Sequence, residues 1–368
     1  MSAPLRVGID ASAAAVPRPT GVGRAIAQAV AALRARDELA LEVLYRLSRL
    51  KRRRHFLPGS AGVFHDRLSL LKARRLDVFH GPDTRLPGFP GPALVATIHD
   101  LSARREGFCT PRFRETRERH WAAALERADL LVTYTAAVAD EVARELGAAR
   151  ERIAVVPLAP SGDLRPPAPA AVEAARERYA GGAPYVLCLG ELSARKNTAA
   201  AVRAFAAADL PGHRLLLVGP AGHGVEEVEA AASSLGERVV RTSYLASAEV
   251  AALLAGAAAF LFPTRYEGFG LPVLEAFLAG VPVVTSRDPS VLEVAGGAAL
   301  HAEAEDPDAL GAALTRAVDE REHYVRAGRA RLAAFSWERT AARLAAVYQA
   351  ARSGEAAPRE LEEAPCSP

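Results

Sequence analysis

Short apolar runs alternate with stretches of helical periodicity along the first part of the chain, and polar residues bound each run. Parallel strands that are covered on both faces read as continuous runs of Val, Ile and Leu. The pattern therefore predicts an α/β unit with a parallel sheet. We expect strands near 5–10, 40–45, 77–80, 93–98, 130–134 and 153–157, and helices near 22–36, 64–74, 112–127 and 136–146.

The same alternation returns after a Pro-rich linker over 159–169, so a second unit of the same class is predicted. The length of 368 residues also favours two domains, because a single core stops growing below that size. Strands are expected near 185–190, 214–218, 238–242, 258–262, 282–285 and 298–301, and helices near 198–208, 224–235, 247–256, 272–279, 307–319, 321–333 and 336–351.

Charge is distributed unevenly between the two parts. Residues 1–165 contain 27 Lys and Arg against 18 Asp and Glu, whereas the remaining residues contain 19 against 25. The N-terminal part is therefore the candidate for contact with anionic surfaces or acceptors. The three cysteines are far apart and show no zinc or redox spacing, and no signal-peptide pattern precedes the first strand. We expect a cytoplasmic protein.

The stretch 263–286 is the most informative part of the sequence. An apolar strand runs into a Gly-rich turn, a helix is expected to begin at Pro272 and to end at Gly280, and another apolar strand follows. The turn leaves the N–H groups of 269–271 at a helix N-terminus, which suits an anion such as a diphosphate.

Two carboxylates bracket this turn, Glu267 before it and Glu275 in the expected first helical turn. Carboxylates do not bind phosphate, but they accept hydrogen bonds from sugar hydroxyls. An ordinary strand–helix–strand unit with an acidic first turn explains the same pattern equally well.

A second candidate follows the strand near 185–190. Gly190 ends this strand, and Asn197 is a good N-cap for the next helix, which places Arg195 and Lys196 beside a helix N-terminus. Paired cations there would bind a diphosphate and neutralise charge on a leaving group. A solvated basic turn is the alternative.

The N-terminal part has weaker candidates. Gly21 and Gly23 open a helix after the first strand and allow close backbone approach, although no complete phosphate-binding motif is present. His99 and, less strongly, His80 stand at strand ends, where an imidazole could hydrogen-bond a hydroxyl. Structural roles are the alternative for all four residues.

Three pieces stand in a fixed order: Gly190-x4-Arg195-Lys196-Asn197, then Tyr244 before a helix, then Glu267-x7-Glu275 around Gly268-Phe269-Gly270-Leu271-Pro272. With these motifs the chain resembles the retaining glycosyltransferases of family 4, which have the GT-B fold of two Rossmann-like domains. The resemblance covers nearly the whole chain. It departs from the commoner residues at Ser243 and at Thr264-Arg265, which bears on recognition of the donor base.

The resemblance implies a domain division: an acceptor-binding domain over 1–165, a donor-nucleotide-binding domain over 166–335, and a helix over 336–352 that packs back toward the first domain. Residues 353–368 are polar and contain Pro, and we expect them to be disordered.

The resemblance also implies roles for individual residues. Arg195 and Lys196 would hold the diphosphate of a nucleotide sugar, Glu275 would bind the ribose and Glu267 the donor sugar. His99 would contact the sugar near the reacting carbon. The remaining donor-side positions are Gly21, Gly23, Gly190, Tyr244, Phe269, Gly270 and Leu271.

By the same resemblance, the enzyme retains the configuration at the transferred sugar, and the departing phosphate accepts the proton of the acceptor. No cofactor and no metal ion are expected, because Arg195 and Lys196 take the place of the metal and no Asp-x-Asp motif is present. The preferred donor is GDP-mannose, and the acceptor is a glycan or a lipid-linked hydroxyl.

Six of the eleven residues over 46–56 are Arg or Lys, with Leu and Phe between them. The part over 49–54 could dock on the inner face of an anionic membrane, or it could be a solvated basic loop.

Other functions remain open. A sugar-nucleotide epimerase or a phosphorylase would share the fold, although none of the three lysines has a setting suited to pyridoxal phosphate. A non-catalytic protein that binds anionic surfaces is a further alternative. Nucleic acid is not an expected partner, because the basic part lacks interleaved aromatic residues.

Overall fold

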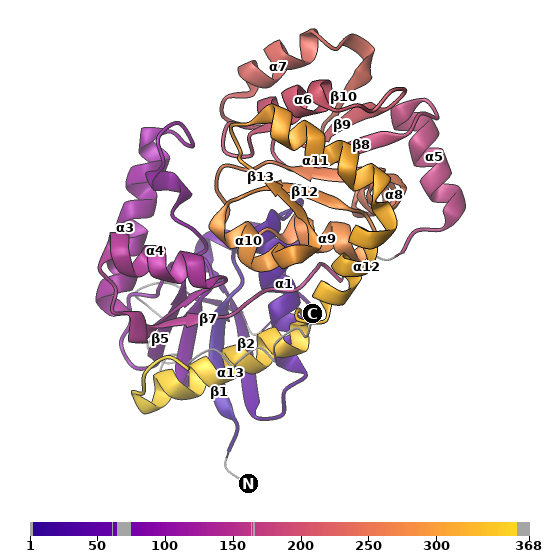
Figure 1. The fold of residues 1–368 in the computed structure, drawn as a ribbon. Helices are drawn as coiled ribbons and strands as arrows, with labels where there is room; N and C mark the ends of the chain where they lie inside the picture. The colour runs from indigo at the N-terminus through magenta and orange to yellow at the C-terminus, as the bar shows by residue number, and fades with distance from the viewer. Residues whose placement is uncertain (1–2, 61, 65–74, 163, 165, 359–368) are drawn as a thin grey trace. The chain divides into compact units, whose positions relative to one another are not determined.

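The computed structural model describes residues 3–60, 62–64, 75–162, 164 and 166–358. Its contacts divide the chain into two units (Figure 1). The first unit holds residues 1–101, 112–159 and 335–368, and the second holds 102–111 and 160–334. The chain therefore contributes a short segment, 102–111, to the second unit, leaves the first unit again near residue 160 and returns to it at Phe335.

The first unit is built on a parallel sheet with the strand order β3-β2-β1-β4-β5-β6-β7 over the described residues. The strand order reverses between β1 and β4, so the loops that follow these two strands diverge. The strands are β1 (Leu5–Asp10), β2 (Leu39–Arg46), β3 (Gly62–Phe64), β4 (Val78–Gly81), β5 (Ala93–Thr97), β6 (Leu130–Thr133) and β7 (Ile153–Val155).

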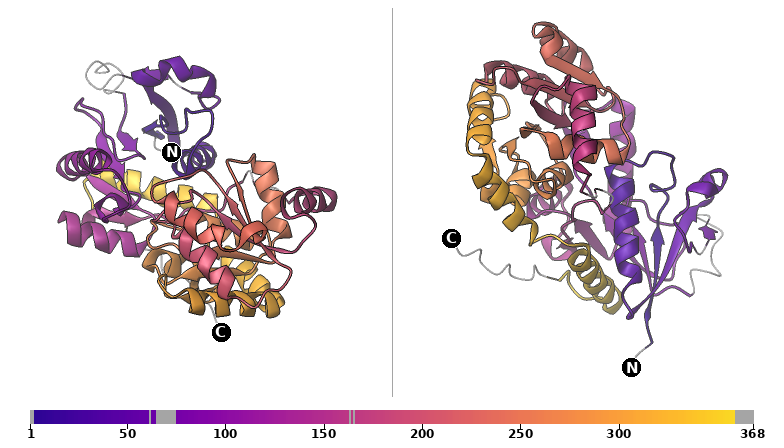
Figure 2. Two further views of the ribbon diagram at one scale, coloured as in Figure 1. Left: turned by 90° about the horizontal axis from the view of Figure 1, so that it is seen from above. Right: turned by 90° about the vertical axis from the view of Figure 1, so that its right-hand side faces the viewer.

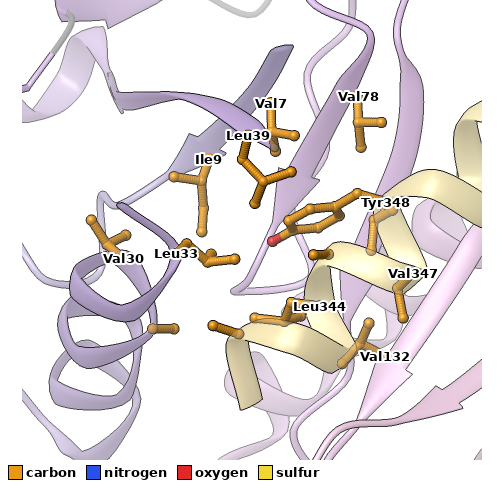
Figure 3. Close-up of a cluster of buried hydrophobic side chains, with 14 of the residues drawn as sticks. Val7, Ile9, Val30, Leu33, Leu39, Val78, Val132, Leu344, Val347 and Tyr348 are labelled. Carbon is orange, nitrogen blue, oxygen red and sulfur yellow. The ribbon is translucent and has the colours of Figure 1, made fainter. Parts of the chain in front are cut away.

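Helices flank this sheet, and α13 of the C-terminal segment, drawn in yellow, packs beside α1 and against β4 and β5 (Figure 2). The apolar faces of α1 and α13 and of the central strands form one buried core (Figure 3). The helices and short 3-10 turns are α1 (Gly21–Arg34), η1 (Leu47–His55), α3 (Pro111–Arg127), α4 (Ala136–Leu146), η3 (Arg150–Arg152) and α13 (Trp337–Ser353). The 3-10 turn η2 (Ser102–Arg104) lies in the segment that belongs to the second unit.

His80 links α13 to the sheet through two hydrogen bonds. Its Nδ1 lies 2.8 Å from the Tyr348 hydroxyl oxygen, and its Nε2 lies 2.8 Å from Thr97 Oγ1. Burial lowers the pKa of His80 to about 3, so the neutral ring donates one hydrogen bond and accepts the other. Both ring nitrogens of His80 are therefore occupied inside the core, which favours the structural alternative for this residue.

The second unit has a parallel sheet with the order β10-β9-β8-β11-β12-β13 over the described residues. Leu, Val and Ala side chains of its strands, α6 and α11 form the core. The strands are β8 (Tyr185–Leu189), β9 (Arg214–Val218), β10 (Val239–Thr242), β11 (Ala259–Phe262), β12 (Val283–Ser286) and β13 (Leu300–Ala302). The helices and 3-10 turns are α5 (Pro169–Ala180), α6 (Thr198–Ala207), α7 (Val225–Ser233), η4 (Gly236–Arg238), α8 (Ser247–Gly256), α9 (Leu271–Leu278), α10 (Pro289–Ala295), η5 (Gly296–Ala298), α11 (Pro307–Asp319) and α12 (Arg321–Leu332).

The sequence analysis missed two helices of this unit. α5 begins at Pro169, which it had assigned to the linker, and ends before Gly181 in the left-handed conformation. α10 has Asp288 at its N-cap and Pro289 at its first position, but seven residues are too few to show helical periodicity. In both cases the sequence contains residues that mark a helix end, but it lacks the periodic apolar positions that would predict the helix itself.

Two differences concern the first unit. The short strand β3 was not predicted, and the basic segment after β2 forms the 3-10 segment η1. The helix expected over 64–74 falls almost entirely outside the described residues, as does most of the tail expected to be disordered. In the part of the chain that the structure describes, no helix is both long enough and apolar enough to cross a membrane.

Candidate functional site

The candidate site of the second unit lies at the carboxyl ends of β8 and β11, where the strand order of this sheet reverses. Ligands of open parallel sheets bind at such a point because the loops that follow the two strands diverge and leave room. The loop after β8 carries Arg195 and Lys196, and the loop after β11 carries Glu267.

Two glycines hold the loop after β8 against the loop after β9. A Cβ atom at Gly219 would lie 1.8 Å from the carbonyl oxygen of Gly190, and Gly219 has a φ of +151°. The N–H of Gly190 donates to the carbonyl of Val218 at 2.9 Å, and that of Leu192 donates to Pro220 at 2.9 Å. This close backbone approach requires glycine at position 219 and fixes the base of the loop that carries the two cations.

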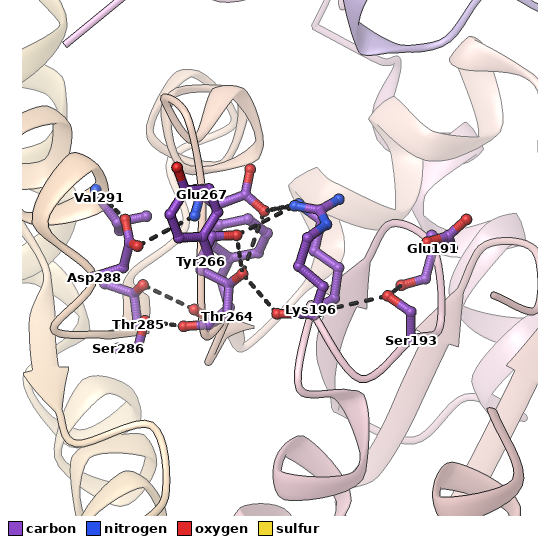
Figure 4. A network of polar contacts seen from close by, with 12 residues as sticks. Glu191, Ser193, Lys196, Thr264, Tyr266, Glu267, Thr285, Ser286, Asp288 and Val291 are labelled. Atoms are coloured by element: carbon purple, nitrogen blue, oxygen red, sulfur yellow. Dashed lines mark hydrogen bonds and ion pairs between the residues drawn. The ribbon is translucent and has the colours of Figure 1, made fainter. Parts of the chain in front are cut away.

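Arg195 and Lys196 both contact the carboxylate of Glu267 (Figure 4). Glu267 Oε1 lies 2.7 Å from an Arg195 guanidinium nitrogen and 2.5 Å from Lys196 Nζ. The side chains are only 24%, 13% and 11% exposed for Arg195, Lys196 and Glu267, so water screens their attraction less than at an open surface. Two cations share one carboxylate, which gives these three side chains a net positive charge suited to an anionic ligand.

Glu267 is held from two further sides. The Thr264 hydroxyl lies 3.3 Å from Glu267 Oε1, and the backbone N–H of Glu267 donates to Asp288 Oδ2 at 3.2 Å. Asp288 also accepts from the N–H of Val291 at 3.0 Å, which caps α10. Burial raises the pKa of Asp288 to about 6, against the effect of these N–H donors. The β11 loop and the start of α10 thus position the glutamate together.

Lys196 is the more deeply buried of the two cations. Its Nζ lies 4.4 Å from the centre of the Phe262 ring, at the end of β11, and gains a cation–π attraction there. Burial lowers the pKa of Lys196, and the Glu267 carboxylate acts in the opposite direction. The charge of the ammonium group therefore depends on a nearby anion.

Asn197 stands at the N-cap position of α6, but its side chain makes no capping hydrogen bond. It adopts a left-handed conformation with a φ of 54°, and its Nδ2 donates to the carbonyl of Ala304 at 2.7 Å. The predicted N-cap position and the helix start at Thr198 are therefore confirmed, but the side chain does not form the capping hydrogen bond. Asn197 instead ties the cation-bearing loop to the segment after β13.

The Gly-rich turn before α9 follows the expected course. Gly270 precedes the helix with a φ of +104°, and Phe269 is buried beneath the turn. The helix begins at Leu271 and includes Pro272, so Glu275 is its fifth residue and not part of the first turn. The Glu275 side chain is 4% exposed.

Tyr244 lies in the loop between β10 and α8 and is 44% exposed. β10 is the edge strand of the sheet, and β9 separates it from β8. The structure thus brings Gly190, Arg195, Lys196 and Glu267 into one cluster with the turn before α9, and Tyr244 stands apart from the ion pairs.

Three predicted residues belong to the first unit. Gly21 is the first residue of α1, and a Cβ atom there would meet no other atom within 4 Å. A Cβ atom at Gly23 would lie 2.7 Å from the Ala13 carbonyl oxygen, so this glycine serves close packing of α1 on the loop after β1. His99 follows β5 and is 8% exposed, and its ring lies 5.3 Å from that of Tyr134. Burial lowers the pKa of His99.

The sequence analysis missed Asp288 and the positioning role of Thr264. Asp288 followed by Pro289 is an N-cap signal that could have revealed α10 and with it the acceptor for the Glu267 N–H. Within the described residues, no group of three or more His, Cys, Asp and Glu side chains is arranged to hold a metal ion.

Comparison with known proteins covers both units. The family model described as "Glycosyl transferases group 1" matches residues 172–331, and that of "Glycosyltransferase Family 4" matches residues 22–159. O-antigen chain mannosyltransferase B of Escherichia coli is 31% identical over 279 residues, which are 71% of this chain and 71% of that protein. An MMP alpha-(1->4)-mannosyltransferase of Mycolicibacterium hassiacum is 30% identical over 281 residues, 72% of this chain and 66% of that protein.

Solved structures show the same fold. Sucrose-phosphate synthase from Thermosynechococcus elongatus superposes with a TM-score of 0.71 at 20% identity, over 94% of this chain and 98% of that one. WaaG, a glycosyltransferase involved in lipopolysaccharide biosynthesis, has a TM-score of 0.67 at 20% identity, over 93% of this chain and 99% of that one. The predicted α/β fold of the GT-B type is thereby confirmed.

We predict that Gly219→Ala lowers the free energy of unfolding by about 3 kcal/mol or more, because the new methyl group meets the Gly190 carbonyl in a conformation that alanine avoids. Denaturant unfolding followed by circular dichroism measures the change. Gly297→Ala is the matched control, since its Cβ atom would meet nothing within 4 Å, and it should change stability by less than about 0.5 kcal/mol. Equal unfolding midpoints for the two variants would contradict this account of the loop.

Proposed function

The chain belongs to the glycosyltransferases of family 4, and from this premise we propose that it transfers a sugar from a nucleoside diphosphate donor to an acceptor hydroxyl. The observation that carries the proposal is the pair of part-buried cations at the strand-order reversal of the second unit. Cleavage of the bond between sugar and phosphate places negative charge on the leaving diphosphate. Cations that are already in position stabilise this charge without reorganisation, and one such donor contributes about 10²–10³ in kcat.

Each side chain has a part in this proposal. Arg195 and Lys196 bind the diphosphate, with the N–H groups of 269–271 at the start of α9 beside them. Glu267 accepts hydrogen bonds from hydroxyls of the donor sugar, and Glu275 accepts those of the ribose. The ion pairs with Glu267 support this assignment, because they hold both cations ready for an anion.

Further residues are assigned to the proposed donor site by the family resemblance alone. His99 approaches the sugar near the reacting carbon, and Gly21 and Gly23 allow the loop before α1 to pass close to the diphosphate or the acceptor. Tyr244 lines the pocket for the base, and its exposure fits a residue that a ligand covers.

We further propose that the transfer retains the configuration of the sugar, needs no metal ion, and uses GDP-mannose as donor. The two mannosyltransferases at 31% and 30% identity favour mannose. The acceptor is the hydroxyl of a glycan or of a lipid-linked glycan.

A thermal-shift panel of GDP, UDP and ADP sugars tests the proposal. A donor held at 100 times its Kd adds about 2.7 kcal/mol to the free energy of unfolding, so the cognate donor should raise the melting temperature. Arg195→Ala and Lys196→Ala should lose this shift while remaining folded. Arg203→Ala, which removes an exposed cation of α6, should keep it.

No shift with any nucleotide sugar, or equal shifts in all four proteins, would overturn the proposed function. With the cognate donor known, NMR of the product shows whether the configuration is retained, and transfer in the presence of EDTA tests independence from metal ions.

The segment η1 supports peripheral contact with an anionic membrane. Leu47 and Leu50 are 45% and 46% exposed at a spacing of three residues, and the basic residues over 51–54 are exposed beside them. Apolar side chains that enter the headgroup region next to cations are typical of interfacial anchors.

We predict that the protein co-sediments with vesicles of phosphatidylcholine and phosphatidylserine at low salt, and that Leu50→Glu reduces the bound fraction. Vesicles of phosphatidylcholine alone serve as the control. Absence of binding to the anionic vesicles would refute membrane contact through η1.

A further inference from the structure

The first unit contains its own cluster of cations at the point where its strand order reverses. Arg46 ends β2, Arg85 follows β4, and Arg117 lies on α3. We include Arg49 and His120: burial lowers the pKa of both, and nearby cations lower it further, Arg52 and Arg85 at Arg49 and Arg85 at His120. We call these five residues the arginine cluster. The loops after β1 and β4 border it, as they would border a ligand site in an open parallel sheet.

Two carboxylates pair with residues of this cluster. Arg46 Nε lies 2.8 Å from Asp10 Oδ2, and Asp83 lies 2.8 Å from Arg85 Nη2 and 3.6 Å from Arg117 Nη1. Among the described residues, the Asp83 carboxylate thus brings two arginines together.

The residue between Asp83 and Arg85 has a strained backbone conformation. Thr84, between them, has a φ of +65°, which is rare for a β-branched residue, and is 1% exposed. Its hydroxyl donates to the Thr97 carbonyl at 2.8 Å and accepts from Arg117 at 3.3 Å. Strain of this kind persists where the surroundings impose it, and it is concentrated at ligand sites.

The arginine cluster also has buried nitrogen atoms without partners. Arg85 Nε, which is a donor, and His120 Nδ1, whose role depends on the tautomer, are buried and have no hydrogen-bond partner among the described residues. His99 is 8% exposed and lies near the charges of Asp83 and Arg117. Buried donors without partners are uncommon, and an anion bound among them would satisfy them.

We propose that the arginine cluster binds a phosphate group carried by the acceptor. A phosphate accepts several hydrogen bonds at once and forms bidentate pairs with guanidinium groups, which fits convergent arginines better than a carboxylate with two oxygens does. The inference rests on the proposed function, because it names the class of acceptor. The shared chemistry is a phosphate, whether on a soluble sugar or on a lipid carrier.

The test measures binding of mannose 1-phosphate by calorimetry to the full chain with Arg195→Ala and Lys196→Ala, so that the donor site does not contribute. This chain should still bind the sugar phosphate, and added salt should weaken binding. Adding Arg85→Gln should weaken it about tenfold to a hundredfold, since a charge-assisted hydrogen-bond pair is lost.

Arg144→Gln is the matched control. It removes the same charge from the first unit at an exposed pair with Glu145, away from the arginine cluster, and binding should not change. Arg85→Lys separates charge from geometry: it keeps the cation and should restore only part of the affinity. Circular dichroism and melting temperature confirm that each variant is folded.

A second arm uses phosphatidylcholine vesicles that carry undecaprenyl phosphate. If the protein binds only the vesicles, and this binding depends on Arg85, the acceptor is a lipid carrier. If it binds only mannose 1-phosphate, again in an Arg85-dependent way, the acceptor is soluble. The proposal is overturned if neither probe binds, if Arg85→Gln and Arg144→Gln act equally, or if mannuronate binds and both phosphates do not.

The experiments distinguish failure of this inference from failure of the proposed function. If Arg85→Gln, with its donor site intact, binds nucleotide sugars as the wild type does and no phosphate binds the arginine cluster, only this inference fails. If phosphate binds in an Arg85-dependent way and no nucleotide sugar binds the wild type, only the donor assignment fails.

Discussion

The contact between the Glu267 carboxylate and the two cations Arg195 and Lys196 is the interaction on which the proposed donor site depends. Part-buried cations next to one another repel, and burial alone lowers the pKa of Lys196. The carboxylate offsets both effects and keeps the cations at one place. Under the proposed function, a diphosphate would offer more negative charge than one carboxylate, so it would pair with both cations and leave Glu267 to bind hydroxyls of the donor sugar.

The surrounding fold holds these three side chains in place. The backbone approach at Gly219 fixes the loop that carries the cations, and the Asn197 side chain ties that loop to the segment after β13. On the other side, Thr264 and Asp288 position the glutamate through its carboxylate and its backbone N–H. Because parallel strands end at one edge of the sheet, residues about 70 positions apart in the sequence meet there.

Most of the fold followed from local pattern, and the details of the site did not. Buried parallel strands are continuous apolar runs, so nearly all of them could be predicted. α10 is too short to show periodicity, and β3 is a three-residue edge strand. The ion pair of Arg195 with Glu267 could not be predicted, because no local signal reports which loops converge. The role of Asn197 was misjudged since its left-handed conformation depends on the Ala304 carbonyl, a tertiary contact.

Affinity for a nucleoside diphosphate without its sugar tests the central claim most directly. Calorimetry at pH 7 compares GDP and UDP binding to the wild type and to Glu267→Gln, which keeps the shape of the side chain and removes its charge. Because Glu267 holds Arg195 and Lys196 in place and favours the charged form of Lys196, the variant should bind the preferred nucleotide about tenfold more weakly, a loss of roughly 1.4 kcal/mol. Affinity of the variant equal to or greater than that of the wild type would contradict the account.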